Sequence, residues 1–557
     1  FQVGGCSVEA HALQHLAASG HTELTTSYLD DIFIGAAADK AAIALVTAEQ
    51  QLAKINLTQN HNKVHGYARD PPGGVRDLPP AVQVTNEGIT VLGVPLGTDE
   101  YVESALDERC KKVEEFINKL PKLPDEQSAL LLLRMCGVPR WVYVIRQLTT
   151  AHPAVATTTQ RIDTCTQQAF CSILRLPDLT DSQLDQLRLP LSLGGCGITD
   201  LTQIAPIAFY SSAAATLHSL KARQLLSDLP DSTLTQQPYF LQVMRARQTV
   251  ERMLPDSNPH LTGSVENLLL AAQPGLQAAL THTLHKRSYE QQVDQAVTLR
   301  DRARLRACVG PGAAGFLAAI PSTPATRLSN QTMQNAVRSR LGLPVGPCQA
   351  VSTCKCGRPI DMYGDHLLAC NCGEERHDRH SALKFCLANI VRQAGLTPHI
   401  ERQVAHLDAT PTHPGDKLDV DFVGPDGTLI GVDVTIVHPC AQSHADAAAR
   451  RNGATLHAME GTKKRKYEKA LTEAGHRFVP AAGETLGRWS GTVARLLHDL
   501  ARHKLDAAPT DNAFLLTRLV DRWWKMLSCT LQKYNSLLLI SRAAAADRDT
   551  GGCEEHE

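Results

Sequence analysis

The chain has 557 residues, which is too long for a single hydrophobic core and predicts several domains. Hydrophobic residues make up 43% and charged residues 20%, an ordinary balance for a globular protein. The formal net charge of −1 excludes a global electrostatic attraction to nucleic acid, so any such binding must use local basic patches. Uninterrupted apolar runs such as Leu130–Leu133 fall far short of the ~18 residues of a membrane span, so we expect no membrane partner.

Two segments are candidate basic patches. The first holds Arg300, Arg302, Arg304 and Arg306, for which a solvated helix face is an equally good interpretation, and the second is the run Lys463–Lys466. The 16 cysteines are scattered along the chain rather than clustered in a small scaffold. We therefore expect mostly reduced thiols and an intracellular protein.

The first hundred residues alternate between helical and strand patterns. Residues 8–19 and 41–55 are expected to be helices, and Leu24 to Gly35 a strand, a turn and a second strand. Alternating apolar residues on both sides of Asn86-Glu87-Gly88 predict a hairpin over residues 82–91.

From residue 104 the apolar spacing becomes helical, and most of residues 104–345 are expected to be helices, with a break at Leu191–Gly195. A cysteine and histidine cluster follows, then a mixed α/β segment to about residue 505 and a helix over 510–545. The predicted fold class is α+β, rich in helices and multidomain.

Tyr28-Leu29-Asp30-Asp31 places two adjacent carboxylates between apolar runs. Adjacent residues on a regular strand point to opposite faces, so both can approach one ion only at a tight turn. Carboxylates at such a turn suit Mg²⁺, and paired ions of this kind serve phosphoryl transfer. The alternative is an exposed turn in which Asp makes local hydrogen bonds.

The surrounding sequence favours the metal site, because it resembles the palm of a reverse transcriptase. The metal-binding turn of that family reads Tyr-x-Asp-Asp, and further matching stretches follow in order: Leu57-x-x-Asn60-x-x-Lys63, Leu92-Gly93 with Gly97, Arg134–Arg140 and Leu189–Gly195. The resemblance implies that Asp30 binds the metal, that Asp31 is its less essential neighbour, and that Lys63 lies near the incoming triphosphate. The family also has a metal-binding Asp and a template-contacting loop before this turn. The 27 residues that precede Tyr28 show neither, so we expect no polymerisation by this chain.

Cys354-x-Cys356, followed by His366 and Cys370, offers three thiols and an imidazole within seventeen positions. Such a set suits tetrahedral Zn²⁺ and would stabilise a segment that is poor in apolar residues. Cys372, His377 and His380 are alternative ligands, and free cysteines in a loop are the simpler interpretation. A closed site with four ligands has no open position for chemistry, so the predicted role is structural.

Lys417–Phe422 alternates in polarity, which predicts a strand with Leu418, Val420 and Phe422 on one face and Asp419 and Asp421 on the other. Pro425-Asp426-Gly427 fits a three-residue hairpin loop with Gly in the left-handed conformation.

That loop length predicts the pairs Phe422 with Ile430, Val420 with Val432, Leu418 with Val434, and Asp419 with Asp433. Directly opposed like charges destabilise a sheet, so the last pair indicates a cation between the carboxylates. An exposed polar face is the alternative.

Downstream, Glu460, Lys463, Lys466 and Tyr467 are spaced to share one helix face. A lysine near a scissile phosphate can stabilise developing negative charge. A solvated basic helix or a nuclear-import signal in Lys463–Lys466 would explain the same residues.

This arrangement resembles the restriction-enzyme-like endonuclease of site-specific non-LTR retrotransposons, which carries a Cys-Cys-His-Cys cluster just upstream. Arg-His and a helix come next in that family, here Arg376-His377 and residues 380–395, and the two acidic strands and Lys-x-x-Lys-Tyr follow. The resemblance implies that Asp419 and Asp433 bind Mg²⁺ or Mn²⁺, that Lys463 or Lys466 assists, that Tyr467 lies at the site, and that Arg376 and His377 contact nucleic acid. Two positions depart from the family: Leu418 replaces Pro, and Thr435 stands where a catalytic lysine is usual.

Together the resemblances span Tyr28 to Arg522-Trp523-Trp524 and imply five regions. These are a partial reverse-transcriptase palm (1–103), a helical thumb and connector (104–345), a zinc element (350–375), a restriction-like endonuclease (376–505) and C-terminal helices with a tail (506–557).

The implied protein is the C-terminal part of a nuclear retrotransposon polyprotein. It would act on target DNA and template RNA, nicking the DNA with a metal-dependent endonuclease and carrying an incomplete RNA-directed DNA polymerase. The alternative is an inactive remnant that binds nucleic acid without cutting it. A small-molecule enzyme has little support, since we find no Gly-rich phosphate loop and no nucleophile elbow.

Overall fold

The computed structural model describes residues 24–28, 31–69, 77–222, 236–254, 275–349, 353–404, 417–506 and 513–551. The protein is 62% helical with several small sheets, which confirms the α+β class. The chain forms two compact units, one of residues 1–112 with 150–158 and the other of residues 113–149 with 159–557. Two of the boundaries between the units fall inside helices, α3 (Asp99–Lys119) and α6 (Pro153–Ile173), and the predicted boundary at residue 103 also falls inside α3.

The first unit begins with an antiparallel pair, β1 (Leu24–Tyr28) and β2 (Asp31–Gly35), in which Tyr28 lies opposite Asp31. The two predicted strands are therefore confirmed, and the residues between them lie outside the described residues. A 3₁₀ turn, η1 (Ala38–Lys40), leads into α2 (Ala41–Ala53), which confirms the second predicted helix. The helix predicted at residues 8–19 lies outside the described residues.

Four short strands complete this unit: β3 (His65–Tyr67), β4 (Gln83–Thr85), β5 (Gly88–Val91) and β6 (Val94–Gly97). The hairpin predicted over residues 82–91 is wrong, because β4 pairs in parallel with β3 and β5 pairs with β6. Leu92 and Gly93 have φ angles of 48° and 79° and make the two-residue turn between β5 and β6. Two left-handed residues suit a tight hairpin, whereas residues 86–88 only change the chain direction.

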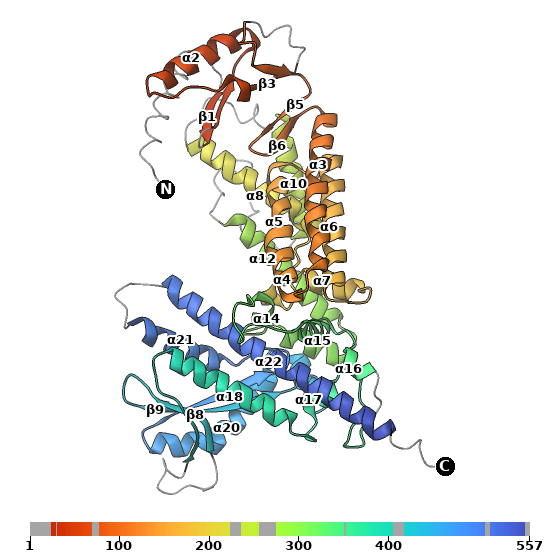
Figure 1. Cartoon of the computed structure of the whole chain (residues 1–557), viewed down its shortest axis with the longest axis vertical. Helices are drawn as coiled ribbons and strands as arrows, with labels where there is room; N and C mark the ends of the chain where they lie inside the picture. The colour runs from red at the N-terminus through yellow and green to blue at the C-terminus, as the bar shows by residue number, and fades with distance from the viewer. Residues whose placement is uncertain are drawn as a thin grey trace. The chain divides into compact units, whose positions relative to one another are not determined.

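The second unit opens with a helical region (Figure 1). After α3 its elements are η4 (Leu120–Lys122), α4 (Glu126–Leu132), η5 (Leu133–Gly137, a π-helix), α5 (Pro139–Gln147), α6 (Pro153–Ile173), α7 (Asp181–Arg188), η6 (Leu191–Leu193), α8 (Leu201–Ala222), α10 (Pro238–Met253), α12 (Leu276–Gln295), α13 (Leu299–Ala307), α14 (Gly315–Ala318), α15 (Asn330–Leu341) and α16 (Gly346–Gln349). The predicted break at Leu191–Gly195 is confirmed as a 3₁₀ turn that ends at Gly194 with a φ of 83°.

One helical run in the described part of the chain, Glu126–Gln147, is long and apolar enough to cross a membrane by length and composition. Half of its apolar window is buried inside the protein, as in the core helix of a globular domain. This is weak evidence for a membrane span, and the expectation of no membrane partner stays a prediction.

A four-stranded sheet forms the centre of the remaining part. Its strands are β7 (His399–Gln403), β8 (Lys417–Val423), β9 (Leu429–Val437) and β10 (Arg477–Glu484), in the order β10-β9-β8-β7. β7, β8 and β9 are antiparallel neighbours, while β10 runs parallel to β9. A parallel neighbour needs a crossover connection, and α20 (Ala454–Glu473) supplies it. The short helix α19 (Ala445–Arg450) precedes α20.

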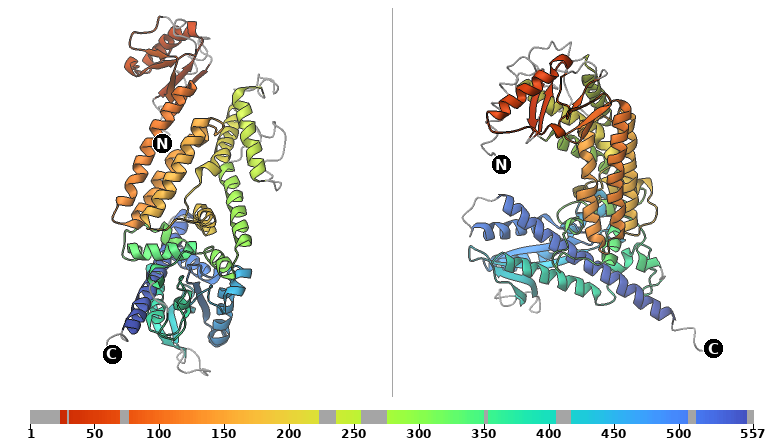
Figure 2. Two further views of the ribbon diagram at one scale, coloured as in Figure 1. Left: turned by 90° about the vertical axis from the view of Figure 1, so that its right-hand side faces the viewer. Right: turned by 45° about the horizontal axis from the view of Figure 1, so that its top comes forward.

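Helices cover both faces of this sheet (Figures 1 and 2). α18 (Glu375–Gln393), α21 (Gly491–Asp506) and α22 (Ala513–Gly551) share the main core with Val420, Phe422 and Val432. The other face packs against α20 through a smaller cluster that includes Leu418 and Tyr467. α20 and α22 confirm the helices expected around residues 460–467 and 510–545.

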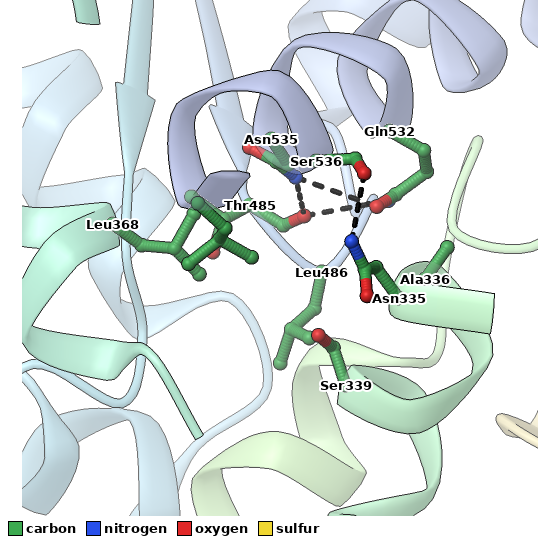
Figure 3. Close-up of a pocket in the computed structure, with 10 residues that line it drawn as sticks. Asn335, Ala336, Ser339, Leu368, Thr485, Leu486, Gln532, Asn535 and Ser536 are labelled. Carbon is green, nitrogen blue, oxygen red and sulfur yellow. Dashed lines mark hydrogen bonds between the residues drawn. The ribbon is translucent and has the colours of Figure 1, made fainter. Parts of the chain in front are cut away.

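A buried polar contact joins α15 and α22 to the segment after β10 (Figure 3). The side-chain amide of Asn335 donates to the Ser536 hydroxyl at 2.9 Å, and that of Asn535 donates to the Thr485 carbonyl at 2.7 Å. The cavity enclosed by these residues has a volume of about 10 Å³, the space of a single water molecule. The cavity is too small for a substrate. The hydrogen bonds around it connect the helical region to the segment that follows the sheet.

Candidate functional site

The predicted Cys354, Cys356, His366 and Cys370 come together at one point. Their ligand atoms all lie within 4.8 Å of one another, so the cluster can hold a metal ion. The Cys354 and Cys370 sulfurs are 3.9 Å apart, and the Cys356 sulfur is 3.2 Å from Nε2 of His366. Burial raises the pKa of the Cys354 thiol to about 11, and a divalent cation is the usual means of holding such grouped sulfurs as thiolates.

Local hydrogen bonds shape this cluster. The N–H of Gly357 donates to the Cys354 carbonyl at 2.8 Å, and the left-handed φ of 79° at Gly357 closes the turn that carries the first two sulfurs. The Asp361 carboxylate accepts the backbone N–H groups of Asp365 and His366, which starts the short helix α17 (Asp365–Ala369). Cys370 is the residue at the end of that helix, so one turn of helix separates the third ligand from the fourth.

The Pro-Asp-Gly loop forms as predicted. The N–H of Gly424 donates to the Thr428 carbonyl at 2.8 Å, and Gly427 adopts a left-handed φ of 79°. The pairs Phe422 with Ile430 and Val420 with Val432 are confirmed. The loop therefore sets the register of β8 and β9 over the residues nearest to it.

Beyond Val420 the predicted ladder is wrong, since neither Leu418 with Val434 nor Asp419 with Asp433 is a backbone pair in the described sheet. The Asp419 carboxylate instead accepts the N–H of Val434 at 2.7 Å, in the place of a ladder hydrogen bond. Leu418 packs on the α20 side of the sheet with Tyr467, whereas Val420 and Phe422 pack on the α18 side. The side-chain bond breaks the regular alternation and brings the Asp419 carboxylate to the backbone next to Asp433.

Asp433 has an ion-pair partner on α20. Nζ of Lys463 lies 2.6 Å from Oδ2 of Asp433, whose side chain is only 6% exposed. Burial raises the pKa of Asp433, the Lys463 ammonium opposes that rise, and the negative charge of Asp419 adds to it. The two predicted acids and one of the two predicted lysines thus form one electrostatic group.

His380, on α18, joins this group rather than the cysteines. Its Nε2 lies 3.0 Å from Oδ2 of Asp419 and 3.0 Å from the Val434 carbonyl oxygen. The hydrogen bond to Asp419 raises the pKa of His380 despite its burial. The sequence predicts His380 only as an alternative ligand of the Cys/His cluster. Its spacing of one helical turn from His377 was the available signal, because that spacing puts both rings on one face.

A cleft of about 420 Å³ opens beside this group. Residues of the loop after Cys370, the start of α18, the end of β9 and α20 line it: Asn371, Gly373, Arg376, His377, Arg379, His380, Val434, Thr435, Ile436 and Lys463. The predicted Arg376 and His377 therefore lie in the same cleft as Lys463. Arg376 also donates to the Asn371 side chain and, at 3.1 Å, to the Ala369 carbonyl, so it fixes the cluster's loop against α18.

Lys466 and Tyr467 are placed differently from Lys463. Tyr467 is 4% exposed and packs 5.4 Å from the Phe478 ring in the small core behind the sheet. The exposed Lys466 carries its ammonium 4.8 Å from the centre of the Tyr467 ring. Tyr467 is therefore a packing residue, and Lys463 is the lysine that contacts Asp433.

The arginines of α13 are not a phosphate patch, nor do they form the alternative solvated face. Arg304 is buried and donates to Oε1 of Gln186 at 2.7 Å, while Arg306 donates to the Ala449 carbonyl at 2.9 Å. Arg300 pairs with the Asp365 carboxylate and lies over the Tyr363 ring. Arg304 thus bonds within the helical region, whereas Arg300 and Arg306 connect α13 to residues 365 and 449.

A second group that can hold a metal by distance consists of Asp365, His438 and Cys440. Nε2 of His438 lies 3.1 Å from Oδ1 of Asp365, and Arg300 pairs with the same carboxylate. His438 and Arg300 hold the pKa of Asp365 at about 2 against the effect of burial. A guanidinium already supplies the positive charge here, so the group acts as a buried ion-pair network.

The predicted polymerase residues belong to the first unit. Asp31 is the first residue of β2 and is exposed, and Lys63 is the exposed last residue of the 3₁₀ turn η2 (His61–Lys63). Asp30 lies outside the described residues. Tyr28 lies opposite Asp31 in the pairing of β1 with β2.

No protein-family model matches the sequence, and a search of curated proteins finds no match.

Proposed function

We propose that the part of the chain from the Cys/His cluster to α21 is a metal-dependent DNA endonuclease. The observation that carries the proposal is that Lys463, which lines one cleft with Arg376 and His377, pairs with Asp433. Asp419 joins this group by accepting the N–H of Val434, which also lines the cleft. Acidic oxygens beside basic side chains are the groups that hydrolysis of a phosphodiester needs.

The donor atoms fit a hard or borderline divalent cation. Asp419 and Asp433 offer carboxylate oxygens, the Val434 carbonyl lies beside them, and such oxygens suit Mg²⁺ and Mn²⁺. A cation bound there would polarise the scissile phosphate and activate a water molecule. The Lys463 ammonium would stabilise the charge that develops on the phosphate, which is the role that Thr435 cannot fill. Arg376 and His377 would bind the neighbouring phosphates and hold the DNA strand in the cleft.

For the Cys/His cluster we propose structural Zn²⁺. Three sulfurs and one imidazole within 4.8 Å match the ligands that tetrahedral zinc prefers. The cluster packs on α22, where Arg542 donates to the Leu367 carbonyl at 2.7 Å and to the Cys370 carbonyl at 3.0 Å. Zinc would therefore order the loop that forms one wall of the cleft.

We also propose that the whole chain is the C-terminal part of a non-LTR retrotransposon protein, with target DNA and template RNA as partners. In this proposal the first unit is part of a reverse-transcriptase palm, and the helices up to α16 are its thumb and connector. The order of the motifs from Tyr28 to Trp524 supports it, together with the antiparallel pairing of β1 and β2.

The test is nicking of supercoiled plasmid by the zinc-loaded full chain with Mg²⁺ or Mn²⁺. Asp433→Asn should lower the nicking rate at least ~100-fold, which corresponds to ~2.7 kcal/mol of barrier. Asp426→Asn is the matched control, because it removes an exposed carboxylate from the loop of the same hairpin and should leave the rate unchanged. Nicking that persists in Asp433→Asn would contradict the proposal.

The second candidate function is DNA binding without cutting. The basic lining of the cleft favours it, because Arg376, His377 and Lys463 attract phosphates with or without a catalytic metal. Salt-sensitive DNA binding by a chain that nicks in neither metal would support this candidate.

A further inference from the structure

A second cleft lies in the helical region. It has a volume of about 160 Å³, and residues from the end of α7, the start of α8 and the second half of α12 line it. None of these residues lines the 420 Å³ cleft of the proposed nuclease site. Every residue that lines the second cleft has a polar side chain, apart from Leu189. The cleft is therefore suited to a polar ligand of its own.

Gln292, on α12, is the residue of this cleft whose side chain lacks a partner. It is only 8% exposed, and neither its side-chain nitrogen nor its side-chain oxygen has a hydrogen-bond partner among the described residues. Most buried polar side chains are hydrogen-bonded, because an unpaired donor or acceptor destabilises the fold. An amide offers a donor and an acceptor side by side, so it matches a planar group whose edge carries an acceptor next to a donor.

The charges of the cleft disfavour an anion. Among the described residues that line it, Arg188 is the permanent cation, and its guanidinium lies 3.2 Å from the Asp200 carboxylate and 3.9 Å from the Asp185 carboxylate. Burial lowers the pKa of His285, so this ring adds no positive charge at neutral pH. Two carboxylates thus accompany one guanidinium, and the cleft favours a neutral group over a phosphate.

The volume of the cleft limits the size of this group. A cavity of about 150 Å³ accommodates one benzene-sized ring. A pyrimidine base is a neutral ring of about that size with a donor next to an acceptor on its edge. His285 also lines the cleft, and histidine is one of the side chains on which unpaired bases stack. A pyrimidine base therefore fits the size, the charge and the hydrogen-bonding groups of the cleft.

We propose that this cleft binds one unstacked pyrimidine base of a single-stranded RNA and prefers cytosine to uracil. The Gln292 amide pairs with the ring nitrogen and the amino group of cytosine, and a carboxylate such as Asp200 accepts the second amino hydrogen. Uracil has a carbonyl oxygen in place of the amino group, which the carboxylates repel. This inference rests on the proposed association with template RNA and does not depend on the nuclease metal site.

The experiment measures the affinity of the zinc-loaded full chain for single-stranded RNA at neutral pH, in buffer without Mg²⁺ or Mn²⁺. Fluorescence anisotropy compares labelled oligomers of cytidine (oligo-C) and of uridine (oligo-U). The wild type should bind oligo-C at least ~5-fold more tightly than oligo-U, which is the discrimination that one bidentate contact to a base provides. Free cytidine should compete weakly with oligo-C, whereas N⁴,N⁴-dimethylcytidine, which has no amino hydrogen, should not compete.

Two variants locate the preference. Gln292→Leu replaces an unpaired buried amide with an apolar side chain of similar size, so the fold should be retained, and zinc content with circular dichroism checks it. This variant should lose the preference for oligo-C and keep the salt dependence of RNA binding, because no phosphate contact is removed. Gln248→Leu on α10 is the matched control, since it removes an exposed amide from the same helical region and should behave as the wild type.

The possible failures are distinguishable. Equal binding of oligo-C and oligo-U by the wild type, or a preference that Gln292→Leu retains, would overturn this inference and leave the association with RNA intact. Competition by N⁴,N⁴-dimethylcytidine as strong as that by cytidine would overturn it without any variant. Free cytidine that binds as tightly as oligo-C would assign the cleft to a nucleoside instead of a strand. If the wild type binds no oligomer, the proposed association with RNA falls as well.

Discussion

Replacing Lys463 with Met tests whether Asp433 depends on its cationic partner. The change removes the ammonium 2.6 Å from Oδ2 and leaves a carboxylate whose side chain is 6% exposed. Breaking a fully buried pair costs about 3–5 kcal/mol, and a hydrogen bond to a charged group contributes ~1.5–3 kcal/mol. Lys463 is 28% exposed, so water can partly replace it, and we expect a loss of about 1.5–3 kcal/mol at neutral pH.

The loss should depend on pH. Burial already raises the pKa of Asp433 above its ordinary value of 3.8, and Lys463 is the main group that lowers it, so the variant raises it further. A carboxyl whose pKa is higher in the folded state destabilises the fold as pH rises from 3.8 through the folded value. The loss of stability in Lys463→Met is therefore largest at neutral pH. It becomes smaller at acidic pH, where the Asp433 carboxyl of the folded protein takes up a proton.

Hydrogen exchange of the β9 amides under increasing urea, in buffer without Mg²⁺ or Mn²⁺, measures the stability of this sheet rather than of the whole chain. Adding Asp433→Asn to Lys463→Met should recover most of the loss, because the uncompensated charge is gone. Lys464→Met is the control, since Lys464 is exposed and pairs only at the surface with Glu468; it should change stability by less than ~0.5 kcal/mol. A loss in Lys463→Met that is below that size, or independent of pH, would refute the reasoning.

Three further outcomes follow from the structure. Cys356→Ser should lose the ~1 equivalent of zinc that elemental analysis finds in the wild type, whereas Cys372→Ser should keep it, and a folded wild type free of zinc would contradict the cluster's role. Gly427→Ala should lower the stability of the β8–β9 sheet by about 1–2 kcal/mol in urea unfolding, because its φ is 79°, while Gly491→Ala at the start of α21, where a Cβ meets open space, should not. Arg304→Met should destabilise the second unit by about 2–4 kcal/mol and leave the salt dependence of DNA binding unchanged; a shallower salt slope would show that Arg304 contacts phosphate.

The parts of the site that sequence predicts well depend on short-range chemistry. Loop length and one left-handed glycine define the register of Phe422 with Ile430, and ligand type with spacing defines the Cys354 to Cys370 cluster. Helical periodicity places Lys463 on a helix, as the structure confirms. Each of these follows from residues within a segment of at most seventeen positions.

The features of the site that sequence does not predict depend on contacts between residues that are far apart in the chain. Leu418 departs from the predicted face because Asp419 accepts a backbone hydrogen bond from the neighbouring strand, and no alternation pattern contains that contact. The arginines of α13 look exposed in sequence, yet Arg304 bonds to Gln186, which lies 118 positions away. His380 lies close to the Cys/His cluster along the chain, so the sequence predicts it as an alternative ligand there. It contacts Asp419 because α18 packs on the sheet.

The central claim is that Asp419 and Asp433 hold one divalent ion at the wall of the basic cleft. Anomalous diffraction at the manganese edge, from crystals of the zinc-loaded chain soaked in Mn²⁺, locates that ion directly. We expect a manganese peak within coordination distance of both carboxylates and of the Val434 carbonyl. A peak that touches neither carboxylate, or no manganese peak outside the Cys/His cluster, would contradict it.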